Sequence, residues 1–180
     1  MPFPIVQSNV PLVFDTLPDL KVRYFRAHGP QDNIYTYAQM YAMPQGLALG
    51  LRAFEQTPGA DSQIVFALGQ PQGSVLRFCL APGEAALDLL AGGDVRPLSL
   101  PEVVRFAGED EHGWYWGAQL VLPAEDLLSA CCTLQAGSAF GIAVLKARAG
   151  IGILGASFRL PAGGEPLQPA LFDEAVVSLY

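Results

Sequence analysis

GWYWGAQLVLPAEDLLSA, residues 113–130, decides the fold because it joins an aromatic-rich strand to a short helix across one proline. Alternation with period two assigns one face of the strand to Trp114, Trp116, Ala118, Leu120 and Leu122. The opposite face receives Tyr115, Gly117, Gln119 and Val121. Pro123 suits a first helical position, and the acidic residues Glu125 and Asp126 suit a first turn. We therefore predict a strand that runs directly into a helix of one or two turns, an arrangement typical of some β-sandwiches.

The composition favours many short strands. About half of the 180 residues are hydrophobic, only 15% are charged, and 19 glycines and 15 prolines punctuate the chain. The length suits one core without disulfide support. We expect one domain over residues 1–180, with an extended N-terminal segment at 1–19, folded as an all-β, two-sheet antiparallel β-sandwich of jelly-roll type with one short helix.

Further strands follow on both sides of the opening stretch. Residues 34–43 and 47–54 alternate around the turn at 44–46 and predict a hairpin. Three strands at about ten-residue spacing follow, each preceded by Gly or Pro, which is typical of a meander. We also expect one edge strand in LKVRYFR, residues 20–26, then a turn at 28–33, and a last strand at 174–180.

Charge and hydropathy exclude two classes of partner. The formal net charge is −7, and ten Lys and Arg residues are too few for a surface that binds nucleic acid. Lys146 and Arg148 interrupt the most apolar window, so we expect no membrane span. The first residues lack a cationic signal sequence, and the three cysteines predict reduced thiols, so the expected compartment is the cytoplasm by default.

Two segments together resemble a known family. IYTYAQMYAMPQGLALGLRAFEQ, residues 34–56, is similar to the strand-turn-strand that opens family 9 carbohydrate-binding modules and the related DOMON-like sandwiches, with Gly46-Leu47 and Arg52 at the matching positions. WYWGAQLVLPAEDL resembles their Trp-containing strand that ends in Pro, and PALFDEAVVSL resembles their closing strand. The chain departs from the family at Gln119, where relatives often carry an acidic residue.

The resemblance implies a jelly-roll sandwich that binds a sugar or another small ligand. The ligand would contact aromatic residues on one face or at an end that carries loops. It does not imply that this chain has kept such a site.

The aromatic residues supply the candidate ligand contacts. Trp114 and Trp116 share a face and suit a platform for a pyranose ring, or else they belong to the core; we favour Trp114 exposed and Trp116 buried. Tyr35, Tyr37 and Tyr41 form a second stripe with Gln39, which is either a ligand face or an ordinary tyrosine-covered exterior. Arg52 on the return strand is a donor for that face, or the partner of a surface acid.

The sequence contains only weak matches to motifs for metal binding, nucleotide binding or catalysis. His28 and His112 lack the spacing of a zinc site, and calcium at the acidic turn 109–111 is the one cofactor left open. Residues 150–155 match G-x-G-x-x-G, but strand and turn residues follow where a dinucleotide site needs a helix. The sequence selects no catalytic residues.

The sequence thus predicts a non-catalytic, carbohydrate-binding-like module whose partner is a saccharide or another small ligand. The alternative is an interaction or structural module that has lost the sugar site. The low charge and high apolar fraction leave room for a homodimer.

Overall fold

A computed structural model describes residues 1–26, 33–163 and 165–179. Their strands, in chain order, are Phe3–Gln7 (β1), Leu20–Lys21 (β2), Tyr24–Phe25 (β3), Thr36–Met43 (β4), Gly46–Ala53 (β5), Ser62–Gly69 (β6), Val75–Leu80 (β7), Ala85–Ala91 (β8), Asp94–Pro97 (β9), Val104–Asp110 (β10), Gly113–Pro123 (β11), Ala139–Arg148 (β12), Gly152–Ala156 (β13) and Asp173–Leu179 (β14). The α-helix is Ala124–Ser129 (α1), and short 3-10 turns occupy Phe14–Thr16 and Pro169–Leu171.

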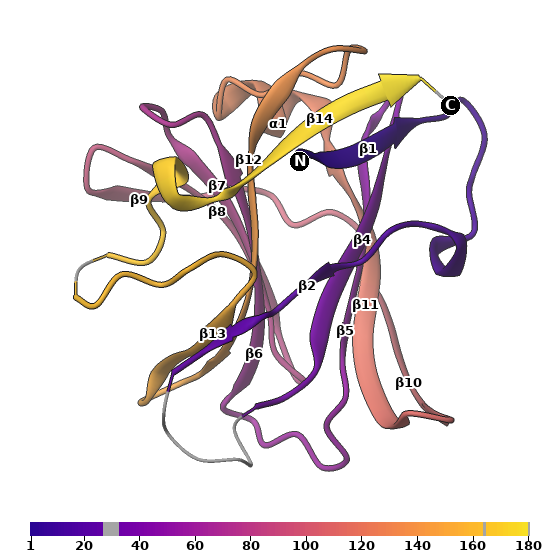
Figure 1. The fold of residues 1–180 in the computed structure, drawn as a ribbon, viewed down its shortest axis with the longest axis vertical. Helices are drawn as coiled ribbons and strands as arrows, with labels where there is room; N and C mark the ends of the chain where they lie inside the picture. The colour runs from indigo at the N-terminus through magenta and orange to yellow at the C-terminus, as the bar shows by residue number, and fades with distance from the viewer. Residues whose placement is uncertain (27–32, 164, 180) are drawn as a thin grey trace.

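The strands form two facing layers that one strand connects (Figure 1). The first sheet has the order β10-β11-β5-β4, and the second has the order β14-β12-β6-β7-β8-β9. β1 lies between β4 and β14 and pairs with both in parallel, whereas the other strand pairings described are antiparallel. The predicted β-sandwich with one short helix is confirmed, with this parallel connection added to the antiparallel layers.

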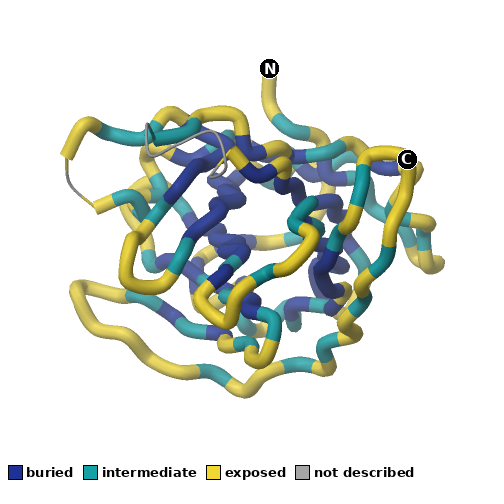
Figure 2. The backbone as a smooth tube through the Cα atoms, turned by 90° about the horizontal axis from the view of Figure 1, so that it is seen from below, coloured by how far each residue is buried: buried dark blue, intermediate teal, exposed yellow. Residues whose placement is uncertain are grey.

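Alternating side chains fill the space between the layers. Leu47, Leu49 and Leu51 of β5 point inward and are fully buried, as is Phe66 of β6. Each such side chain contributes roughly 1.5–3 kcal/mol to folding through burial. Figure 2 views the molecule along the layers, with buried segments around the centre and exposed turns at the rim.

The outer face of the second sheet is covered by the chain itself. Val65 and Leu145 on this face pack with Phe158 and Phe172, which come from the segment between β13 and β14. The two phenylalanine ring centroids lie 5.5 Å apart. This packing gives the second sheet apolar contacts on both sides.

The helix forms where the sequence predicts it, one residue later. Pro123 has an extended backbone and is the N-cap, and Glu125 and Asp126 lie in the first turn. Leu127 is buried, whereas Leu128 is exposed. The helix has six residues, and no helix among the described residues is long and apolar enough to cross a membrane.

The segment at residues 20–26 differs from the single edge strand that we predicted. β2 pairs with β4 of the first sheet, and β3 pairs with β13 at the second sheet. The chain therefore crosses from one layer to the other, and no continuous strand forms. Most of the predicted turn at 28–33 lies outside the described residues.

Candidate ligand-binding face

The outer face of the first sheet carries rows of side chains that the strand register brings together. One row runs across four strands from Tyr37 of β4 through Arg52 of β5 and Gly117 of β11 to Phe106 of β10. Tyr115 faces the same way two residues before Gly117. Residues distant in the sequence thus meet at one end of this face.

Arg52 lies at the centre of this group. Its guanidinium carbon lies 4.5 Å from the ring centroid of Tyr115, 5.5 Å from that of Phe106 and 5.7 Å from that of Tyr37. Its nitrogens lie 3.6 Å from a carboxylate oxygen of Asp15 and 3.9 Å from one of Asp110. The sequence allowed two roles for Arg52, a ligand contact or an ion pair with a surface acid. In the structure Arg52 lies among three aromatic rings and also forms two long ion pairs.

The rings around Arg52 form a continuous cluster, which we call the aromatic platform. Its members are Tyr35, Tyr37, Phe54, Phe106, His112 and Tyr115. Phe54 joins the others, because its centroid lies 5.4 Å from Tyr35, 5.7 Å from Tyr115 and 5.9 Å from His112. Tyr35 and His112 are exposed, and Tyr37 is buried beneath the cluster.

Two glycines in the sheet leave room for platform rings to approach the backbone. A Cβ atom added to Gly117 would lie 2.8 Å from the ring of Phe106 and would also collide with the carbonyl oxygen of Leu51. A Cβ atom at Gly108 would meet the ring of Tyr115 at 2.9 Å. The platform therefore needs glycine where its rings cross β11 and β10.

Charged groups surround the platform. Nζ of Lys21 lies 5.7 Å from the ring centroid of Tyr35, and a hydrogen bond with the Tyr35 hydroxyl raises the pKa of Lys21. Burial raises the pKa of Tyr37 to about 12, although the Arg52 charge acts in the opposite direction. Tyr37 is therefore neutral under ordinary conditions and is a hydrogen-bonding base of the platform.

The other end of the same face is covered by the N-terminal segment. Tyr41 packs against Phe14, with ring centroids 5.6 Å apart, and the amide of Gln39 donates to Asp19 over 2.8 Å. Both Tyr41 and Gln39 are buried. A groove of about 380 Å³ remains beside them, lined by Phe14, Tyr41, Val104, Gln119 and Val121 among others.

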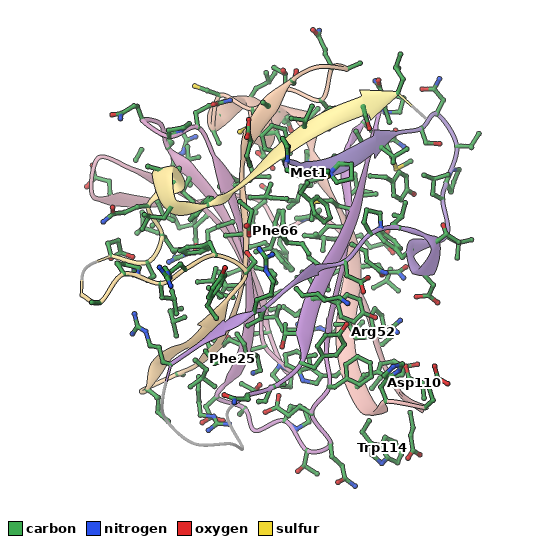
Figure 3. The ribbon with its side chains drawn as sticks, viewed as in Figure 1. Met1, Phe25, Arg52, Phe66, Asp110 and Trp114 are labelled. Carbon is green, nitrogen blue, oxygen red and sulfur yellow. The ribbon has the colours of Figure 1, made fainter. Side chains whose placement is uncertain are left out.

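The two tryptophans divide as the sequence analysis favoured. Trp114 is 47% exposed at the turn between β10 and β11, and Figure 3 shows it at the same end of the molecule as Asp110. Trp116 is 6% exposed, belongs to the core, and donates its indole N–H to Glu55 over 3.1 Å. Of the two tryptophans, only Trp114 is therefore accessible from outside.

A buried polar cluster lies beneath the loop that carries Phe54. Glu55 accepts hydrogen bonds from Trp116 and from the Ser62 hydroxyl, and Nζ of Lys146 lies 3.5 Å from the Glu55 carboxylate. Lys146 is fully buried and also bonds to Ser62, and burial lowers its pKa. This cluster fixes the residue next to Phe54 and so supports the platform from below.

Several of these residues escaped the sequence analysis. Phe54, Phe106, His112 and Tyr115 were not among the candidates, although alternation already placed Tyr115 on the face opposite Trp114. Lys146 follows the inward-facing Ile142 and Val144 at two-residue spacing in β12. This alternation could have predicted that the lysine is buried. In the described ranges, no group of three or more His, Cys, Asp or Glu side chains is arranged to hold a metal ion.

Comparisons with known proteins identify the fold. The chain matches a family 9 carbohydrate-binding module from Caldicellulosiruptor kristjanssonii in complex with cellotriose, with a TM-score of 0.64, 10% identity, and coverage of 98% of this chain and 94% of that one. A family 9 module from the same organism in complex with glucose gives 0.58 and 11% identity, over 98% and 96% of the two chains.

A third solved structure has the same fold. A Bacteroides uniformis protein to which carbohydrate binding has been ascribed gives a TM-score of 0.63 and 11% identity, over 91% of this chain and 88% of that one. No family model and no curated protein matches the sequence. The chain thus has the β-sandwich fold of family 9 carbohydrate-binding modules, and the DOMON-like part of the resemblance stays a prediction.

Proposed function

We propose that this chain is a non-catalytic module that binds a saccharide on the aromatic platform. The observation that carries the proposal is Arg52 held 4.5 Å from the ring centroid of Tyr115 within a cluster of partly exposed rings. The fold supports it, because solved structures of the same fold contain cellotriose and glucose.

The platform has the two kinds of group that a sugar needs. The C–H-rich face of a pyranose packs on flat rings, for which Tyr35, Phe54 and Tyr115 are the accessible candidates. Hydroxyl groups at the sugar edge need charged or polar partners, and Arg52 among the rings and Asp110 beside it supply a donor and an acceptor. The arrangement suits a polar ring-shaped ligand better than a purely apolar one.

The candidate residues from the sequence take different parts in this proposal. Tyr35 and Arg52 contact the ligand, and Tyr37 supports them from below. Trp114 is exposed but lies on the face of β11 opposite Tyr115, so it is not part of the platform. Trp116, Gln39 and Tyr41 are buried, so they stabilise the surrounding sheet and do not contact the sugar.

Isothermal titration calorimetry with neutral, acidic and amino sugars and their oligomers tests the proposal. We expect saturable binding of at least one class by the unchanged protein, with calcium and with a chelator compared in parallel. Phe54→Ala and Tyr35→Ala each weaken binding about tenfold, because the packing of a sugar face on one aromatic ring contributes on the order of 1 kcal/mol or more.

Tyr24→Ala is the matched control, because Tyr24 is also an exposed aromatic residue but lies on β3 beside the second sheet. This variant binds like the unchanged protein. Absence of binding across the whole panel, or equal loss in Tyr24→Ala and Phe54→Ala, would contradict a saccharide site on the platform.

A further inference from the structure

The two outermost strands of the sheet order differ in how well they resist pairing with another chain. β9 ends the second sheet with four residues and finishes at Pro97, which has no backbone N–H to donate. β10 ends the first sheet with seven residues, VRFAGED, and contains neither proline nor lysine. In the part of the chain that the structure describes, no strand pairs with the outer side of β10 (Figure 1).

Symmetry restricts how β10 could pair with itself. A two-fold axis perpendicular to the plane of the sheet keeps each side chain on its own face of the sheet. In an antiparallel pair, two residues directly opposite each other have their side chains on the same face. The numbers of opposed residues must therefore add to an even sum. A pairing centred on Ala107 meets this condition and matches all seven residues of the strand, with Val104 opposite Asp110 and Phe106 opposite Gly108.

The same register pairs opposite charges. It sets Arg105 against the partner's Glu109, and the two-fold axis repeats the pair. Both residues are exposed in the single chain. A shift of two residues toward the N-terminus opposes Arg105 to Ala107 and loses the charge pair, and a shift the other way uses Glu111, which lies in the turn beyond β10.

Arg105 is already positioned at this edge. Its Nη1 donates to the backbone carbonyl oxygens of Ala81, at 2.6 Å, and Pro82, at 3.3 Å. A guanidinium has five N–H donors, so these bonds use only part of its capacity. The side chain is therefore held in place with less conformational entropy left to lose on pairing.

From this edge and its charge pattern we infer that the chain forms a two-fold dimer through antiparallel pairing of β10 with β10 of a second copy, in the register centred on Ala107. The two first sheets then form one continuous sheet, with both outer faces on the same side. The inference stands independently of the proposed saccharide site.

Sedimentation equilibrium from low to high micromolar concentration measures the association. The unchanged protein shifts from monomer to dimer over this range. Glu109→Arg opposes two arginine pairs across the axis and weakens dimerisation roughly tenfold or more, because like charges directly opposite destabilise a strand pair. Asp94→Arg makes the same charge change on β9, where Asp94 is exposed, and dimerises like the unchanged protein.

Exchanging the charges of Arg105 and Glu109 tests whether these two residues pair directly, as this register requires, or whether only the net charge of the protein matters. Arg105→Glu and Glu109→Arg each dimerise about tenfold or more weakly alone. An equimolar mixture of the two variants forms heterodimers about as tightly as the unchanged protein dimerises, and the double variant dimerises again. Circular dichroism checks that each variant is folded. If Arg105→Glu does not fold, the comparison of Glu109→Arg with Asp94→Arg tests the inference. A monomer at every concentration, or a dimer that Glu109→Arg leaves intact, would overturn the inference.

Discussion

The outer faces of the two sheets both carry aromatic side chains but use them differently. On the second sheet, Phe158 and Phe172 come from the chain's own later segment and cover the strands with apolar contacts. On the first sheet, the platform rings surround a charged guanidinium, and Tyr35 and His112 stay exposed. One face is closed by the protein itself, and the other is left open at one end.

The difference shows which aromatic residues serve stability and which are available to a ligand. A ring buried among aliphatic side chains contributes mainly through burial. A half-buried ring beside Arg52, Lys21 and Asp110 gains less from burial but has polar neighbours that a polar ligand can use. The predictions below test this division, beginning with the largest expected effect.

Removing a ring from the closed face costs the most stability. Phe158→Ala lowers the free energy of unfolding by about 3–5 kcal/mol, because Phe158 is 3% exposed and its loss leaves a cavity. Phe54→Ala on the open face costs roughly 2 kcal/mol less, since Phe54 is already partly exposed. Urea unfolding of both variants measures the difference, and equal losses would contradict the division between the faces.

Removing the charge beneath the platform is the next largest effect. Lys146→Met removes the nearest cation from the largely buried Glu55 carboxylate, leaves Arg148 at 4.0 Å from it, and costs about 3 kcal/mol. The double variant Lys146→Met with Glu55→Gln recovers most of this loss, because the amide oxygen of glutamine still accepts from Trp116. Thermal and urea unfolding of the single and double variants check the coupling; additive losses would show that the two charges do not interact.

A methyl group in the sheet displaces a platform ring. Gly117→Ala costs about 2 kcal/mol, because its Cβ atom collides with the Leu51 carbonyl and the Phe106 ring. Gly83→Ala is the control, since a Cβ atom there meets nothing within 4 Å. Unfolding measurements on both variants make the comparison, and a neutral Gly117→Ala would mean that the ring is not held against the glycine.

The smallest stability effect follows from pH. The pKa of Tyr37 is about 12 in the folded chain against 10.0 for an ordinary tyrosine. Between these values the unfolded chain loses a proton that the folded chain keeps, so the free energy of unfolding falls as pH rises, by on the order of 1–2 kcal/mol. Tyr37→Phe removes this part of the pH dependence. Identical pH profiles for the two proteins would show that Tyr37 is not shielded.

Alternation of apolar and polar residues in the sequence was enough to predict much of the β-sandwich. The alternation at 113–123 assigned the faces of β11 and buried Trp116, because one side of a strand in a sandwich must face the core. The same pattern did not reveal the parallel pairing of β1, since alternation fixes the faces of a strand but neither its partner nor its direction.

The candidate site was less predictable, because it depends on strand register and on cover from distant residues. Tyr41 and Gln39 lie on the expected stripe, but Phe14 and Asp19 cover them from the N-terminal segment, 20 residues or more earlier in the chain. Phe54 and Tyr115 meet only because β5 pairs with β11. Neither contact leaves a periodic signal in the sequence.

Amide chemical-shift mapping by NMR during titration with the tightest-binding saccharide is the most direct test of the open face as the ligand site. The account predicts that the largest shifts occur at the backbone amides of Tyr35, Phe54 and Tyr115. The amides of Phe158 and Phe172 stay unchanged. Shifts concentrated on the closed face, or spread evenly over both sheets, would contradict it.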